Sequence, residues 1–130
     1  MHILIILSLL ASFASNAEES AIVKGKFQVY LPKKVVANLV VIKLVEQQTP
    51  QNTRLISTQR CSLVSNHVCK IVLPYFRNDI DRSKRYAVNT SIIYQQGNRK
   101  EIDNSSFPVL TFGHGQELNA VISIPPLPID

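Results

Sequence analysis

The chain has 130 residues, of which 45% are hydrophobic and 18% are charged, and its 14 Lys and Arg outnumber its 9 Asp and Glu for a formal net charge of +5. This length suits one domain, since domains commonly contain about 100–150 residues. The apolar content excludes an intrinsically disordered chain, and the counts of 4 Gly and 7 Pro exclude a collagen-like fibre.

The N-terminal segment predicts an export signal. Ile3–Ala14 is uncharged and mostly apolar; it is too short for a membrane-spanning helix of about 20 residues but matches the apolar region of a signal peptide. Small residues at Ser15 and Ala17 predict cleavage after Ala17, so we expect residues 1–17 to be removed. The mature protein is then periplasmic or secreted, with no transmembrane segment and, lacking a Cys at this point, no lipid anchor. The alternative is a buried N-terminal strand or helix.

Two strand patterns open the mature chain. From Val23 to Tyr30 apolar and polar residues alternate, which is typical of a half-buried strand. Val35–Val45 is rich in β-branched residues and is apolar at successive positions, so we expect a central strand covered on both faces. The polar segment Glu46–Thr53, which contains Pro50, predicts a loop.

The two cysteines lie in the next two predicted strands, residues 54–62 and 68–73, the second of which ends at Pro74. An even number of cysteines in an exported chain is typical of a disulfide. If the two strands form a hairpin, Cys61 and Cys69 lie opposite each other, so the sequence predicts a bridge between them. The alternative is a pair of reduced thiols in the core.

A polar segment, Tyr75–Arg85, interrupts the strands and has room for one short helical turn. Alternation from Tyr86 to Tyr94 predicts a strand with both tyrosines on one face. Gly97, within a Gln-Gly-Asn sequence, predicts a hairpin turn that leads into a short return strand over Arg99–Asp103.

The last part of the chain predicts two more strands. Phe107–Phe112 is expected at a sheet edge because it contains Pro108, and Leu118–Ile124 alternates after a Gly-rich turn. Seven or eight short strands without a long helix predict an all-β fold, a single β-sandwich of mainly antiparallel strands. We expect this domain to occupy residues 18–124 and a Pro-rich tail to occupy residues 125–130.

Several stretches, in order, carry a family resemblance: IVKGKFQV, LPKKVVANLVVIKLVE, VCKIVLPYFRNDI, RYAVNTSIIYQQGNRKEIDN and FPVLTFGHGQELNAVISI. Their order and spacing from about Ile22 to Pro125 resemble the YscW/YbaY-type family of small exported proteins, which includes type III secretion pilotins. The resemblance implies a β-sandwich, no catalytic activity and a protein partner. Family members are typically lipoproteins, and this chain lacks the Cys that would carry the lipid.

Residues for catalysis or metal binding form no familiar set. His67 and His114 lie in separate predicted turns, and their spacing matches no zinc motif. Asp79 and Asp81 are followed by basic residues, which is typical of a solvated loop rather than a cation site. There is no G-x-S-x-G elbow and no Gly-rich phosphate loop. We therefore predict a protein that is not an enzyme and has no catalytic residue, no metal ion and no cofactor.

Basic and aromatic side chains make the segment after Pro74 the candidate binding surface. The candidate residues are Tyr75, Phe76, Arg77, Arg82, Lys84 and Arg85. A second group of lysines, Lys24, Lys26, Lys33 and Lys34, gathers near the first predicted strand. Ordinary solubilising charge is the other interpretation of both groups. Nucleic acid is not expected as a partner, because no aromatic platform interleaves the charges and export removes the chain from it.

The leading hypothesis is a non-catalytic exported β-sandwich that binds another cell-envelope protein, as a pilotin-like or chaperone-like accessory factor of a secretion or envelope system. Binding is expected at an exposed strand edge or in an apolar groove between the sheets. The alternative is a binder of an anionic envelope polymer or lipid surface through the basic loop 77–85.

Overall fold

A computed structural model describes residues 19–63 and 68–125, so the predicted export signal, His67 and most of the predicted tail lie outside the described residues. The elements in chain order are β1 (Ser20–Tyr30), β2 (Val35–Thr49), β3 (Asn52–Ser62), β4 (Val68–Phe76), the 3-10 helix η1 (Arg77–Asp79), β5 (Arg85–Gln96), β6 (Arg99–Val109) and β7 (Glu117–Ser123). No helix in these residues is long and apolar enough to cross a bilayer.

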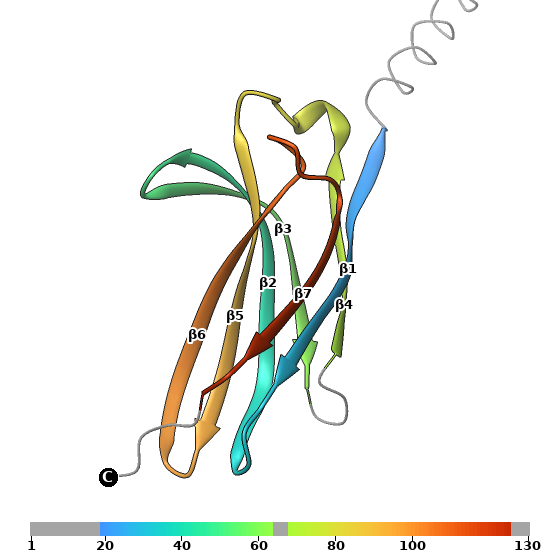
Figure 1. Cartoon of the computed structure of the whole chain (residues 1–130). Helices are drawn as coiled ribbons and strands as arrows, with labels where there is room; N and C mark the ends of the chain where they lie inside the picture. Colours follow the sequence, from blue (N-terminus) through green and yellow to red (C-terminus); the bar gives the residue numbers. More distant parts are fainter. Residues whose placement is uncertain (1–18, 64–67, 126–130) are drawn as a thin grey trace, which may run out of the picture.

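The strands form two sheets that pack face to face (Figure 1). One sheet has the order β4-β1-β7, in which β1 pairs antiparallel with β4 and parallel with β7. The other sheet has the order β3-β2-β5-β6 and is antiparallel throughout. The all-β sandwich predicted from the strand pattern is confirmed.

The core lies between the sheets because alternate residues of each strand point inward. On β5 the buried positions are Tyr86, Val88, Thr90, Ile92 and Tyr94, as the alternation predicted. The predicted short helical turn and the hairpin turn at Gly97 are also present, as η1 and as the β5–β6 connection.

Three predicted boundaries are wrong, and in each case tertiary pairing overrides a local polar or Pro signal. The predicted loop Glu46–Thr53 belongs mostly to β2 and β3, which meet in a tight turn and form a hairpin tip that projects from the body (Figure 1). The predicted strand 99–103 and residues 107–109 of the predicted strand 107–112 belong to the single strand β6, which pairs with β5 along its whole length, whereas residues 110–112 lie beyond its end. β4 does not end at Pro74, because at this sheet edge its missing N–H removes no ladder hydrogen bond.

The prediction that Val35–Val45 is covered on both faces is also wrong in part. This segment lies in β2, which is central in its sheet, between β3 and β5. Its inward residues, such as Val40, Ile42 and Leu44, are fully buried, and on the opposite side Val45 is buried too, whereas Val36 is 55% exposed. The two-layer sandwich supplies no third layer to cover the outer face.

Cys61 and Cys69 form the predicted disulfide, with a Cα–Cα distance of 6.1 Å. The predicted hairpin geometry is wrong, because β3 and β4 belong to different sheets. The bridge therefore connects the two layers of the sandwich at one margin rather than two neighbours in one sheet.

Gly25, in the middle of β1, permits the parallel pairing of β1 with β7. It has a φ of +151°, and a Cβ atom at this position would overlap the carbonyl oxygen of its β7 partner, Leu118. A backbone that comes this close leaves room only for hydrogen, so glycine is required here.

We expect Gly25→Ala to destabilise the protein by at least about 3 kcal/mol, because either β7 must move away from β1 or the strand must distort. Chemical denaturation followed by circular dichroism measures this loss. Gly115→Ala is the matched control, since a Cβ at Gly115 meets nothing within 4 Å. Equal stabilities for the two variants would contradict the close-approach argument.

Replacing both cysteines by serine should lower the free energy of unfolding by about 2–3 kcal/mol, because the unfolded chain is no longer constrained by the short loop. The far-ultraviolet spectrum should keep its β character, since the apolar core remains. Thermal melting of the C61S/C69S variant, compared with the oxidised protein, tests both parts; loss of the folded spectrum would show that the bridge is required for folding.

Candidate functional site

One end of the molecule gathers the β2–β3 hairpin tip, the loop 77–85 and the turn 110–116 (Figure 1). At its centre lies Glu46, which is only 3% exposed although it is charged. Glu46 has the same parity along β2 as Val40, Ile42 and Leu44, so strand alternation directs its carboxylate toward the interior. A buried carboxylate needs charged or polar partners, and this one has three.

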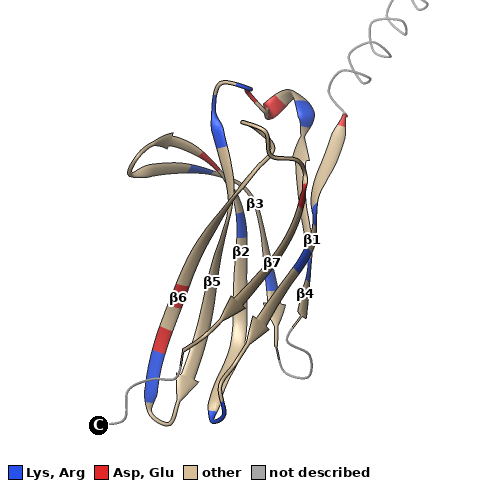
Figure 2. Ribbon diagram, viewed as in Figure 1, with Lys and Arg blue, Asp and Glu red and all other residues tan. Residues whose placement is uncertain are grey.

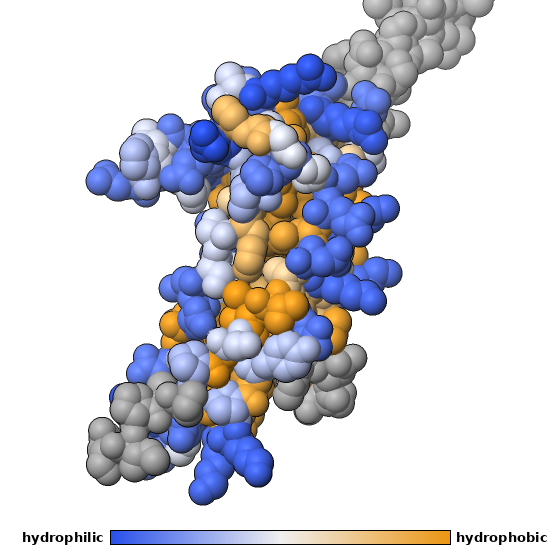
Figure 3. Space-filling view, in the orientation of Figure 1, coloured by the Kyte–Doolittle hydropathy of each residue, from blue (hydrophilic) through white to orange (hydrophobic). Residues whose placement is uncertain are grey.

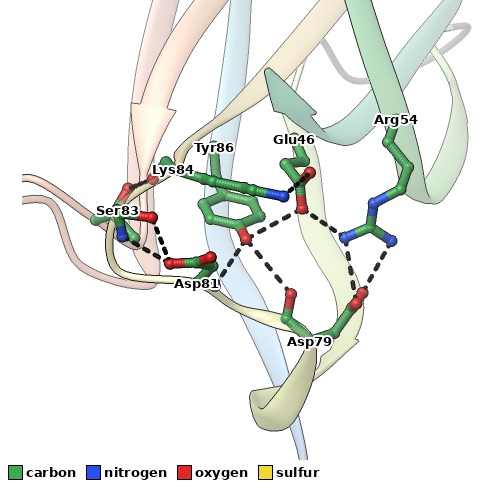
Figure 4. Close-up of polar contacts among 8 residues, drawn as sticks. Glu46, Arg54, Asp79, Asp81, Ser83, Lys84 and Tyr86 are labelled. Carbon is green, nitrogen blue, oxygen red and sulfur yellow. Dashed lines mark hydrogen bonds and ion pairs between the residues drawn. The ribbon is translucent and has the colours of Figure 1, made fainter. Parts of the chain in front are cut away.

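The partners of Glu46 come from three different elements (Figure 4). Arg54 of β3 donates from Nη2 to Oε2 at 2.7 Å, and Lys84 Nζ lies 3.4 Å from Oε1. Tyr86 of β5 donates its hydroxyl to Oε2 at 3.2 Å. The guanidinium of Arg54 also contacts both carboxylate oxygens of Asp79, at 3.1 and 3.2 Å. This network therefore ties the loop 77–85 to the four-stranded sheet.

These contacts change the acid–base properties of the buried groups. The hydrogen bond from Arg54 holds the pKa of Glu46 at about 2, well below its usual value and in spite of the opposing effect of burial. Burial raises the pKa of Tyr86. Glu46 is therefore ionised and Tyr86 protonated at neutral pH, which makes the pair a fixed acceptor and donor.

The loop itself is ordered by a compact turn. The Asp81 carboxylate accepts hydrogen bonds from the backbone N–H and the hydroxyl of Ser83, which lower its pKa, and the Asp81 N–H donates to the hydroxyl of Tyr86 at 2.8 Å. Thr111 Oγ1 donates to the carbonyl of Lys84 at 2.7 Å and so attaches the loop to the turn 110–116. Asp79 and Asp81 are exposed loop residues, as predicted, and their hydrogen bonds also position this loop.

Two of the predicted basic residues have partners within the molecule. Lys84 contacts Glu46, and the guanidinium of Arg85 lies 4.2 Å from the centroid of the Phe112 ring. Phe112 is held there with a φ of +58°, a conformation uncommon for a residue other than glycine. Two of the basic side chains near the loop 77–85 are thus engaged by other side chains of the same molecule. A role of this loop in binding a partner stays a prediction.

The other predicted residues separate into two surfaces. A cleft of about 320 Å³ brings together Tyr75, Arg77 and Arg82, with the Tyr75 hydroxyl donating to Gln116 Oε1 at 3.1 Å. Phe76 points to the opposite side of β4 and is 57% exposed. There it lines a second groove with Leu55 of β3. The binding roles of Tyr75 and Phe76 stay predictions.

Within the described ranges, no three His, Cys, Asp or Glu side chains are close enough together to hold a metal ion. His114 lies in the turn before β7, beside Phe112 in a shallow cleft. The network around Glu46 consists of satisfied hydrogen bonds and ion pairs, which is the geometry of a structural clamp.

The margin between β3 and β4 is closed. Besides the disulfide, Gln59 of β3 reaches the edge of β4, where its side chain donates to the Lys70 carbonyl at 2.6 Å and accepts from the Val72 N–H at 2.9 Å. This amide occupies backbone groups that a further strand would use. The inward residues of β4 are all buried, namely Cys69, Ile71, Leu73 and Tyr75, whereas the inward Gln59 and Cys61 of β3 are partly buried.

The margin between β6 and β7 is open. On β6 the inward residues Glu101, Asp103, Ser105 and Phe107 are half-exposed, and on β7 the inward Leu118 and Ile122 are half-exposed too. In Figure 3 apolar side chains are visible in the middle of the face that contains these strands. Burial, together with the neighbouring carboxylates of Glu101 and Asp103, raises the pKa of Tyr94. The open margin is apolar at Phe107 and Leu118, and nearer the β5–β6 hairpin it carries the carboxylates of Glu101 and Asp103 together with the basic Arg99.

Sequence reasoning missed Glu46, Arg54 and Gln59. The signal for Glu46 was its parity, since it continues the inward row of an apolar strand. No local signal marks Gln59, because its contacts are with β4, and Arg54 was missed because the hairpin that pairs it with Glu46 was predicted as a loop.

Comparison with known proteins shows one clear likeness. The chain is similar in structure to an alternative pilotin from the type II secretion system of Vibrio cholerae, with a TM-score of 0.58 and 18% sequence identity over 82% of this chain and 99% of that chain. No protein-family model matches the chain, and no curated protein matches it. The likeness confirms the pilotin-like fold that the sequence predicted, while membership of the YscW/YbaY-type family stays a prediction.

The Glu46 network predicts a specific acid sensitivity. A carboxylate whose pKa is lowered on folding stabilises the protein above its unfolded pKa of about 4.5, and this contribution is lost as pH falls toward about 2. Glu46→Gln should therefore cost about 2 kcal/mol at pH 7 and flatten the decline of stability between these two pH values. Urea denaturation across this range measures both effects.

Glu117→Gln is the control for loss of one carboxylate, because Glu117 is exposed on β7, and its stability at pH 7 should stay within about 0.5 kcal/mol of the parent. If the Glu46→Gln protein declined with acid as steeply as the parent, Glu46 would not be the group responsible.

Proposed function

We propose that this chain is a non-catalytic accessory protein of a secretion system, exported to the cell envelope, where it binds another protein through the open margin between β6 and β7. The observation that carries the proposal is the contrast between the two margins of the sandwich. The margin at β3 and β4 is closed by the disulfide and by Gln59. At the margin of β6 and β7, inward side chains of both strands are only partly buried, whereas at the other margin those of β4 are all buried.

The fold supports the class of function. A pilotin from a type II secretion system has a similar fold, and a disulfide is typical of proteins that function in an oxidising compartment. The satisfied polar network at the loop end and the absence of a metal-ligand cluster among the described residues support a binding rather than a catalytic role.

The margin also indicates what kind of segment would fit. Leu118, Ile122 and Phe107 offer apolar contacts, and burying half-exposed apolar side chains contributes about 25 cal/mol per Å². A segment of the partner that lies between the two edge strands would complete the core, either as an added strand or as an amphipathic helix. Basic side chains at one end of that segment would complement Glu101 and Asp103.

Site-specific crosslinking tests this proposal. A photoreactive amino acid is placed at Ser105, which points inward at the margin, and in a second protein at Asn104, the next residue on β6, which points outward. Irradiation in an envelope extract of the source cells should crosslink a secretion-system component from position 105 and not from position 104. Equal labelling from both positions, or none from either while both proteins are folded, would contradict binding at this margin.

A further inference from the structure

The outer face of the three-stranded sheet carries an unusual charge arrangement. Lys24 and Lys26 of β1 and Lys70 of β4 are all exposed on this face (Figure 2), and Lys26 lies directly opposite Lys70 in the antiparallel register. Like charges directly opposite each other destabilise a sheet. Among the strand residues of the face, Glu117 of β7, the register partner of Lys24, is the one acidic side chain.

Apolar side chains lie directly beside these lysines. Ile22, Val72 and Phe76 are 40%, 42% and 57% exposed, and Ile22 is the register partner of Pro74. These four residues form a continuous apolar patch at one end of the face, because register partners and their diagonal neighbours lie within contact distance on a sheet. Tyr30, at the other end of β1, is 53% exposed, and Lys33 and Lys34 follow it in the β1–β2 turn.

This face needs a partner that is both anionic and apolar. Protein surfaces that combine lysines with exposed Phe, Ile and Val suit the interface of a bilayer, where headgroups are charged and the acyl boundary is apolar. A soluble anionic polymer would satisfy the lysines but would leave the patch of Ile22, Val72, Pro74 and Phe76 in water. A second copy of the chain would place the same lysines against one another.

We propose that the outer face of the β4-β1-β7 sheet docks on an anionic phospholipid membrane, with Lys24, Lys26 and Lys70 against the headgroups and Phe76 and its apolar neighbours at the acyl boundary. The margin between β6 and β7 and the outer face of the β4-β1-β7 sheet are separate surfaces. A membrane-bound protein can therefore still present the margin to a protein partner, and membrane docking stands whether or not the margin binds one.

Vesicle flotation with the purified protein tests the proposal. The protein should bind vesicles of phosphatidylcholine that contain phosphatidylglycerol, bind pure phosphatidylcholine weakly, and lose binding as salt is raised. The K24Q/K26Q/K70Q variant should bind about 100-fold more weakly, since each basic residue near an anionic bilayer contributes about 1 kcal/mol. Phe76→Ser should weaken binding without changing its salt dependence.

Two matched controls make the result specific. The K43Q/R60Q/K100Q variant removes the same charge from exposed positions of the other sheet, and Val36→Ser removes an exposed apolar residue there. Both should bind as the parent does, and thermal melting confirms that all variants are folded.

Three outcomes would overturn the proposal. The first is equal loss of binding in the two triple variants, which would indicate a nonspecific effect of net charge. The second is binding to soluble polyglutamate as tight as to vesicles and unaffected by Phe76→Ser, which would indicate an anionic polymer. The third is a dimer in sedimentation velocity that the K24Q/K26Q/K70Q variant alone changes, which would assign the face to a second copy.

Discussion

The margin between β3 and β4 holds the two layers of this sandwich together. Three kinds of interaction follow one another along β3: the covalent bridge at Cys61, the side-chain amide of Gln59 on the backbone of β4, and the ion pair of Arg54 with Asp79. Each joins the four-stranded sheet to the other layer or to the loop that follows it. Because this margin is closed by several independent means, the opposite margin can remain open without loss of the fold.

The closed margin between β3 and β4 also explains where the molecule is able to bind another chain. An exposed strand edge is a hazard because its unpaired backbone groups recruit other chains. At β4 this edge is blocked by Gln59 and by Pro74, which has no N–H to offer. Strand edges and half-buried apolar residues remain at β6 and β7, so the fold directs association to one side. The outer face of the three-stranded sheet adds a second, chemically different surface, cationic and apolar rather than acidic and apolar.

The loop end of the molecule differs from what its composition suggests. Four basic residues close together in the segment 77–85 look like an anion-binding surface, yet Lys84 and Arg85 are engaged by Glu46 and Phe112. Lysines that are scattered in sequence, by contrast, converge on one sheet face through strand register. Basic residues that lie close together in the sequence therefore did not predict where basic side chains gather on the surface of the structure.

The sequence by itself determined where most of the strands lie and, where apolar and polar residues alternate, which side of a strand faces the core. Both depend on alternation over a few neighbouring positions, as in β1, β5 and β7, and a period of two needs no knowledge of the rest of the chain. Glu46 was not identified in this way, because the strand before it is apolar at successive positions and the polar stretch after it was predicted as a loop. The disulfide also followed from the sequence, because it needed only two cysteines and an oxidising compartment.

Only the tertiary structure decided which strands pair. The pairing in turn decides which side chains lie together on each surface of the molecule. The parallel contact of β1 with β7 joins residues 24–30 to residues 117–123 and depends on the missing side chain of Gly25. The contact of Gln59 with β4 and the opposed pair Lys26 and Lys70 likewise depend on strand neighbours that are distant in sequence. Local patterns contain no information on such pairings, since strand register is a property of the assembled sandwich.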